Sequence, residues 1–238
     1  MTKYFKILFL LFILFLSNSL YSQNTSSTAN TEPSWDNQFL VGNKFVWDKG
    51  KWRYSGELHF RLKNDVQSLN QYYIEGVATY MYNEHLEIVP DFRATVFPDR
   101  VEYRPGLGLI YKLFWKRKKN NQLVQQTKWQ TDIVNTGYYD HAIRYMLFYN
   151  YELSDKWIAQ TAGGVLYRFS ESHTGIEFIR ALIGATYKLN KNNSFYFSYF
   201  VGAENRVTHY TFIGGPLIQF VFRFDNNNKY IPAQYMNF

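Results

Sequence analysis

The segment WRYSGELHFRLK, residues 52–63, alternates bulky apolar residues with polar or charged residues along its whole length. The first set comprises Trp52, Tyr54, Gly56, Leu58, Phe60 and Leu62, and the second comprises Arg53, Ser55, Glu57, His59, Arg61 and Lys63. Because successive side chains of a β-strand point to opposite faces, this segment predicts a strand with one apolar face and one ionic face.

Segments with the same period of two follow one another along the chain, separated by turn-forming residues such as Asn135-Thr-Gly137 and Asn190-Lys-Asn-Asn193. Past residue 37, no sustained helical period interrupts them. The pattern predicts strands at 38–47, 51–63, 71–82, 85–97, 101–116, 122–136, 138–152, 157–169, 175–189, 194–204 and 208–224, with a weaker one at 229–238. Because the connections are short, we expect an all-β, antiparallel up-and-down barrel.

The alternation slips in the segment 175–189. Glu177 and Arg180 are an odd number of positions apart, so a regular strand points them to opposite faces. If both belong to the polar face, one extra residue must be accommodated between them. We therefore expect a β-bulge at this point.

The number of strands depends on residues 229–238. A closed barrel with both ends in the periplasm needs an even number of strands. Twelve strands result if residues 229–238 close the barrel, and ten result if it closes at Phe224 with residues 38–47 outside. Pro232 fits poorly in a paired strand because it has no backbone N–H. We expect twelve strands, with ten as the alternative.

The first 22 residues have the pattern of a secretory signal peptide. Lys3 and Lys6 supply positive charge, the ten residues Ile7–Leu16 are all apolar, and small polar residues follow. An apolar run of this length is too short for a transmembrane helix, which needs about 20 residues. The expected parts of the chain are a cleaved signal peptide at 1–22, a flexible spacer at 23–37 and a barrel at 38–238.

The composition excludes several classes of protein. Aromatic residues make up 20% of the chain, which is incompatible with disorder. The chain has no cysteine, which excludes disulfide scaffolds, iron–sulfur proteins, thiolate zinc sites and a lipid anchor on cysteine. The formal net charge of +7 is weak evidence for nucleic-acid binding and is equally compatible with anionic lipid headgroups.

Periodicity alone does not say which face of the strands is outside. Three features favour a transmembrane barrel over a soluble, lipocalin-like barrel with an apolar ligand pocket: long segments, aromatic residues near segment ends, and arginine on the polar faces. In this arrangement the polar faces line the lumen, and carboxylates neutralise the arginines. The expected lumen network comprises Arg53, Glu57, Arg61, Asp91, Arg93, Glu102, Arg104, Asp132, Asp140, Arg144, Arg168, Arg180 and Arg223.

The pattern of strands and arginines resembles that of a family of exported outer-membrane β-barrels of Gram-negative bacteria, domain-of-unknown-function family 2490. The resemblance covers about residues 36–225. The residues that carry it are Trp52, Glu57-Leu-His-Phe-Arg61, Gln71-Tyr-Tyr73, Asp91-Phe-Arg93, Arg100-Val-Glu-Tyr-Arg-Pro-Gly106, Arg144-Tyr145, Tyr149-Asn-Tyr151 and Tyr167-Arg-Phe169. It implies an outer-membrane barrel and no particular activity.

The sequence predicts no catalytic, cofactor or metal site. None of its five histidines forms the His-x-Ser motif typical of outer-membrane lipid hydrolases, although His209-Tyr-Thr211 is similar. The histidines also lack the spacing that brings two imidazoles to one metal ion. A lipid-modifying hydrolase remains an alternative because of the polar residues Ser170, Ser172, His173 and His209.

We therefore expect an integral protein of the outer membrane, exported through its signal peptide. Its lumen, lined by arginine and carboxylate side chains, is expected to be structural or a narrow solute pathway, without enzymatic activity and without a cofactor. The expected partners are outer-membrane lipid, lipopolysaccharide and the outer-membrane assembly machinery, and not nucleic acid. The alternatives are the membrane-embedded hydrolase and the soluble ligand-binding barrel.

Overall fold

The computed structural model describes residues 35–115, 121–170, 174–205 and 210–236. In these ranges one 13-stranded sheet contains every strand. The strands are β1 (Trp35–Asn37), β2 (Phe39–Gly50), β3 (Trp52–Lys63), β4 (Ser68–Met81), β5 (Leu86–Val96), β6 (Val101–Phe114), β7 (Gln122–Val134), β8 (Tyr139–Glu152), β9 (Trp157–Phe169), β10 (Gly175–Lys188), β11 (Asn193–Asn205), β12 (Tyr210–Arg223) and β13 (Asn227–Asn228). Within the same ranges, no helix has the length and apolar character needed to cross a membrane.

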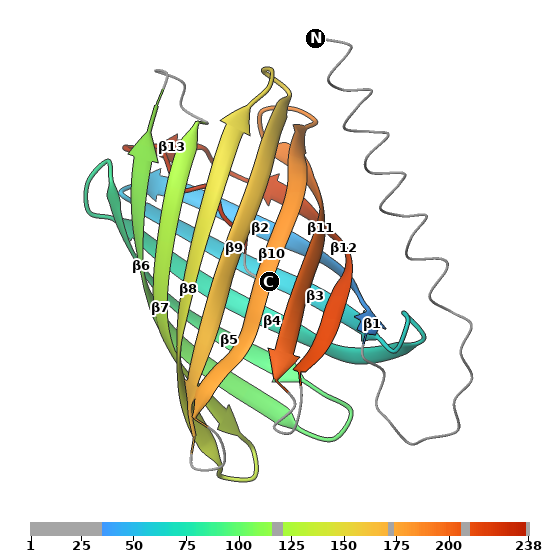
Figure 1. Ribbon diagram of the computed structural model, residues 1–238. Helices are drawn as coiled ribbons and strands as arrows, with labels where there is room; N and C mark the ends of the chain where they lie inside the picture. Colours follow the sequence, from blue (N-terminus) through green and yellow to red (C-terminus); the bar gives the residue numbers. More distant parts are fainter. Residues whose placement is uncertain (1–34, 116–120, 171–173, 206–209, 237–238) are drawn as a thin grey trace. The chain divides into compact units, whose positions relative to one another are not determined.

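The strands β2 to β12 form a closed barrel (Figure 1). Each strand pairs antiparallel with the next one in the chain, and β12 pairs parallel with β2 from Leu217–Leu40 to Arg223–Val46. The connections are short; for example, Gly137 takes a positive φ of 90° and donates a hydrogen bond to Val134 O at 2.9 Å. The expected all-β, up-and-down barrel is confirmed.

The barrel has two open ends, which we call rims. Rim 1 contains the connections 64–67, 97–100 and 135–138, which precede β4, β6 and β8. Rim 2 contains the connections 82–85, 153–156 and 189–192, which precede β5, β9 and β11, and it is the upper end in Figure 1. Because β2 and β12 are parallel, the chain enters the barrel at rim 1 and leaves it at rim 2.

All eleven strands expected between residues 38 and 224 are present, but the expected closing strand at 229–238 is wrong. Only Asn227 and Asn228 pair with the end of β2, and residues 229–236, the described part of that range, form no strand. The barrel therefore has eleven strands rather than twelve or ten. The physical reason is that β12 itself occupies the edge of β2, and the residues that follow bond to side chains inside the lumen.

A short strand precedes the barrel within residues expected to belong to the spacer. Residues 35–37 form β1, which pairs parallel with β12 at residues 212–214. The chain then passes very close to β12, and Gln38 N donates a 2.8 Å hydrogen bond to Gly214 O. A Cβ atom at Gly215 would overlap the backbone oxygen of Gln38, so this crossing requires glycine.

The expected bulge is confirmed in β10. The register with β9 shifts between Ile176 and Phe178, which leaves Glu177 as the extra residue. Glu177 reaches Arg168 inside the lumen, where Arg180 also lies. The bulge therefore brings both charged side chains of β10 to the polar face.

The two faces of the barrel wall have opposite character. On β3, Glu57 and His59 are 2% and 1% exposed, whereas Tyr54 and Phe60 are 47% and 40% exposed. On the other strands most charged side chains also lie inside, and large apolar side chains cover the outside. This arrangement is the inverse of a soluble domain, in which the apolar face is buried.

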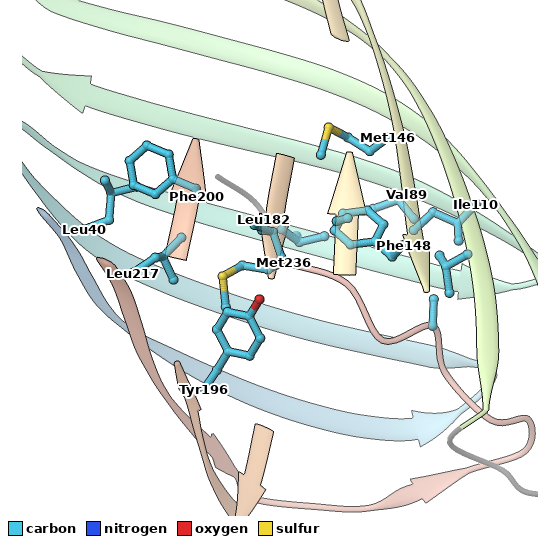
Figure 2. Close-up of a cluster of buried hydrophobic side chains, with 14 of the residues drawn as sticks. Leu40, Val89, Ile110, Met146, Phe148, Leu182, Tyr196, Phe200, Leu217 and Met236 are labelled. Atoms are coloured by element: carbon cyan, nitrogen blue, oxygen red, sulfur yellow. The ribbon is translucent and has the colours of Figure 1, made fainter. Parts of the chain in front are cut away.

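The lumen also contains an apolar cluster, which the alternation of residues does not predict (Figure 2). It draws residues from β2 and from every strand between β4 and β12, including Ile110, Phe148 and Leu217, so it spans the lumen. Ala233 and Met236 from the end of the described chain belong to it, and Figure 2 shows Met236 among the strand residues. The lumen is therefore not lined by charges along its whole length.

Candidate functional site in the lumen

Charged side chains inside the barrel pair across neighbouring strands. Arg168 on β9 binds three carboxylates on three other strands: Asp132 at 2.7 Å, Asp140 at 3.4 Å and Glu177 at 2.5 Å. Arg104 on β6 also contacts Asp132. Because the guanidinium group carries five donors in a planar fork, one arginine connects several strands.

A second group of charges lies on β4, β5 and β7. Arg93 binds Glu75 at 3.1 Å, and its guanidinium group stacks 4.0 Å from the ring of Tyr73. Lys128 binds Asp91 at 2.6 Å and lies 3.7 Å from the other oxygen of Glu75. Each of these charges is almost completely removed from solvent, so the pairing offsets a large cost of desolvation.

A third group contains the histidine of the opening segment. His59 Nε2 lies 3.2 Å from Glu57 Oε2 and 2.8 Å from the side-chain amide nitrogen of Gln219. Lys44 binds the other oxygen of Glu57 at 2.6 Å, and the His59 ring stacks on Tyr73. His59 is thus part of the buried polar packing of the lumen.

The structure places all thirteen residues of the expected network on the inner face. Arg144 contacts Gln126 at 3.4 Å. Arg104 and Arg168 both contact Asp132, and Arg168 also binds Asp140. The other residues pair as Arg53–Asp48, Glu57–Lys44, Arg61–Glu204, Asp91–Lys128, Arg93–Glu75, Glu102–Arg104, Arg180–Glu204 and Arg223–Asp48. They do not form one cluster, because Arg53 and Arg223 meet Asp48 near rim 2 whereas most of the others lie toward rim 1.

The expected thirteen-residue network leaves out several charged residues of the lumen, chiefly lysines and their partners. The missed residues are Lys44, Asp48, Glu75, Glu87, Lys112, Lys128, Glu177 and Glu204. The period of two could have found most of them, since they lie on the same strand faces as the arginines. The emphasis on arginine excluded them.

Two cavities lie inside the barrel, one toward each rim. The cavity toward rim 1 has a volume of about 770 Å³ and is lined by Arg61, Arg104 and Arg168, among others. The cavity toward rim 2 has a volume of about 860 Å³. Along β9, Leu166 lines the first cavity and Ile158 lines the second, while Ala162 between them belongs to the apolar cluster. The cluster therefore separates the two cavities.

The described residues offer little for catalysis. The closest hydroxyl–imidazole pair is Thr131 Oγ1 with His141 Nδ1, 2.9 Å apart on the outer face, and no described carboxylate hydrogen-bonds to that histidine. Ser170 contacts the hydroxyl of Tyr138, and the other residues of the hydrolase alternative, Ser172, His173 and His209, lie outside the described ranges. In those ranges, no three His, Asp or Glu side chains are placed to hold a metal ion.

Comparison with known proteins identifies a family but no activity. No curated protein matches the sequence. Among solved structures, the NanC porin aligns with 70% of this chain and 86% of its own, at 11% identity and a TM-score of 0.49. The KdgM porin in complex with disordered oligogalacturonate aligns with 72% of this chain and 91% of its own, at 17% identity and a TM-score of 0.45. The family described as "Protein of unknown function (DUF2490)" matches residues 34–212, and the chain therefore belongs to this family, as its strand and arginine pattern indicates.

Proposed function

We propose that the protein is an integral β-barrel of the outer membrane of Gram-negative bacteria. Its lumen serves as an ionic structural core or as a narrow solute pathway, and it carries no enzymatic activity. The observation that carries this proposal is the inverted wall, with large apolar side chains exposed around the outside and charged side chains buried inside. A lipid environment removes the cost of such an exterior.

The aromatic residues of the outer face support the membrane location, because they gather near both rims. Stacked or tilted ring pairs near rim 2 are Trp47–Phe224, Trp52–Tyr80, Trp115–Tyr149 and Trp157–Tyr187. Pairs toward rim 1 are Phe60–Tyr72, Phe92–Tyr103 and Trp129–Phe169. Tyrosine and tryptophan favour the headgroup level of a bilayer, so two such belts match its two interfaces.

The strand lengths support the same proposal. The strands β2 to β12 contain 11 to 14 residues each. At about 3.3 Å per residue and a tilt of about 45°, they span roughly 26 to 33 Å along the barrel axis. This is enough for the apolar band of about 25 Å that outer-membrane barrels present.

The contents of the lumen support a structural core or a narrow pathway rather than a wide pore. Paired charges line it toward rim 1, and the apolar cluster fills its centre. A barrel of this size has an interior that side chains largely fill. A solute pathway through the lumen therefore requires a rearrangement of the apolar cluster at its centre.

Fractionation tests the membrane location. The chain with its leader, expressed in a Gram-negative host, is expected in the outer-membrane fraction and to need detergent for extraction. The folded barrel is also expected to migrate differently on gels before and after heating. Recovery in the aqueous fraction without detergent would contradict the proposal and favour the soluble ligand-binding barrel.

Incubation with labelled phospholipid and lipopolysaccharide tests the absence of enzymatic activity. Purified barrel is expected to leave both substrates unchanged. Release of a fatty acid or a headgroup by the purified barrel would favour the lipid-modifying hydrolase instead.

A further inference from the structure

We infer that residues Ile231–Met236, called the lumen segment below, are a built-in plug that occupies a peptide-binding site inside the barrel. Release of this segment connects the two cavities into one passage. The inference rests on the proposed membrane barrel for its role in transport, but the plug itself rests on contacts between the segment and the barrel wall.

The wall binds the backbone N–H groups of the lumen segment through two side chains. Ala233 N donates to Glu87 Oε1 at 2.9 Å, and Gln234 N donates to Gln122 Oε1 at 3.0 Å. The same Gln122 donates from Nε2 to Pro232 O at 3.2 Å. The side-chain amide of Gln122 thus donates to one backbone carbonyl of the segment and accepts from one backbone N–H, as the backbone of a neighbouring strand does.

Three more side chains bind the carbonyl groups of the lumen segment. Lys112 Nζ donates to Ile231 O at 2.6 Å, and Asn150 Nδ2 donates to Gln234 O at 2.9 Å. Gln160 Nε2 also lies 3.5 Å from Gln234 O. The five binding residues belong to five consecutive strands, β5 to β9, so the site follows the curve of the wall.

These binding side chains are buried where the segment covers them. Glu87 is 1% exposed, and Lys112, Gln122 and Asn150 are 0% exposed. Polar groups without access to water need partners, and the segment backbone supplies them. The site is therefore complementary to an extended peptide, and residues 231–236 are its occupant.

The side chains of the lumen segment add apolar contacts at the centre. Ala233 and Met236 are buried in the apolar cluster, and the Tyr235 ring lies 6.2 Å from the Phe148 ring. Burial raises the pKa of the Tyr235 phenol, and the nearby Glu87 carboxylate raises it further, so the ring stays uncharged. Lys44 Nζ lies 5.5 Å from the same ring.

The position of the lumen segment shows what it blocks. Its residues line the cavity toward rim 2 and none lines the cavity toward rim 1. Two of its residues, Ala233 and Met236, also belong to the apolar cluster that separates the two cavities. It is not part of the sheet: β12 pairs with β2 up to Arg223, and the residues that follow bond to β2 no further along the chain than Lys229. Its removal is therefore compatible with a closed barrel.

Conductance of the purified barrel in planar bilayers tests the inference. We compare the full chain with a chain ended after Asn228 and with the full-length variant Gln122→Leu, which loses two hydrogen bonds to the segment. The matched control is Gln126→Leu, because Gln126 is an equally buried glutamine on the same strand that contacts Arg144 and not the segment. The expected result is roughly a ten-fold rise in ion conductance for the first two variants and none for the control. Equal conductance of the full and shortened chains, both folded, would overturn the inference.

Thiol labelling in detergent tests the plug without a membrane and without truncation. The chain has no cysteine, so Ala233→Cys and, at an exposed position near rim 2, Asn226→Cys each provide one reactive group. Cys at 233 is expected to react with a polar maleimide at least about ten-fold more slowly than Cys at 226, and Gln122→Leu is expected to reduce that difference. Equal rates at the two positions would contradict the plug, whereas extraction of the protein without detergent would contradict only the membrane location.

Discussion

The two halves of the lumen satisfy their buried polar groups in different ways. Toward rim 1, charges on the wall pair with charges on neighbouring strands, as Arg168 does with Asp132, Asp140 and Glu177. Toward rim 2, the wall residues Glu87 and Lys112 pair with each other and also bind the lumen segment. In the described residues, these rim 1 charges pair within the wall, whereas Glu87 and Lys112 also bind residues outside the sheet. The same alternation of residues has thus built a fixed ionic core and a site that needs an occupant.

Replacement of the central arginine of the rim 1 half is expected to have the largest effect. Arg168→Met leaves three carboxylates without their shared partner, so the free energy of unfolding should fall by about 3–5 kcal/mol. Urea unfolding in detergent, followed by gel mobility, measures the change.

The matched control for this variant is Arg100→Met. Arg100 pairs with Asp99 at the exposed edge of rim 1, where an ion pair contributes about 0–1 kcal/mol. Equal loss of stability in both variants would show that the lumen network contributes no more than a surface pair.

In the rim 2 half, Glu87 and Lys112 are expected to behave as a single ion pair that also holds the lumen segment. Glu87→Leu leaves the buried Lys112 without its carboxylate and should lower the free energy of unfolding by about 3 kcal/mol. The double variant Glu87→Leu, Lys112→Leu should recover the part of this loss that comes from the unpaired charge, because both charges are then gone, while the hydrogen bonds to Ala233 N and Ile231 O stay lost. A double-mutant cycle by urea unfolding measures the recovery.

The same rescue should fail in the rim 1 half, where Arg168 has three partners on three strands. Combining Arg168→Met with Asp140→Asn is expected to restore only a minor part of the stability, since Asp132 and Glu177 remain. Full recovery in that double variant would remove the distinction between the two halves.

A charge on the outside of the wall should cost less than either lumen variant but more than a surface change in water. Leu109 lies near the middle of β6 and is 52% exposed, so Leu109→Arg places a cation in the lipid at a cost of about 2–3 kcal/mol. Tyr82→Arg near rim 2 is the control and should cost about 0–1 kcal/mol. Folding into lipid vesicles measures both; equal values would contradict burial of the outer face in lipid.

The smallest effect is expected at the hydroxyl–imidazole pair of the outer face. Thr131→Ala removes the contact with His141, which no described carboxylate orients, so stability should change by less than about 1 kcal/mol and lipid should remain uncleaved. Mass spectrometry of incubated lipopolysaccharide and phospholipid checks the second point. Lipid cleavage that disappears in this variant would establish the hydrolase alternative.

Much of the wall could be predicted from the sequence because the side-chain period of a strand is local. The alternation in residues 52–63 assigns Glu57 and Phe60 to opposite faces, and the structure places Glu57 inside and Phe60 outside. The slip between Glu177 and Arg180 predicts the bulge in β10 for the same reason. These properties depend only on which residue follows which along one strand.

The interior could be predicted only in part. Arg168 is expected on the inner face from its place in the sequence, but its three partners come from β7, β8 and β10, and their choice depends on strand register and on the bulge. Val124 and Phe148 also lie on the inner face, where their apolar character is unexpected for a polar lumen. Their role becomes clear only because strands far apart in the sequence bring them together around Met236.

The sequence by itself determined the strands and the two faces of each strand, because these follow from a period of two along the backbone. The length of the segments, the aromatic residues near their ends and the arginines on the polar faces indicated which face is inside. Only the tertiary structure decided the closure between β12 and β2, the eleven-strand count and the place of residues 231–236. Those features depend on contacts between residues that are more than a hundred positions apart, such as Lys112 and Ile231. Pairing of that kind is set by the curvature and register of the whole sheet, which no local pattern contains.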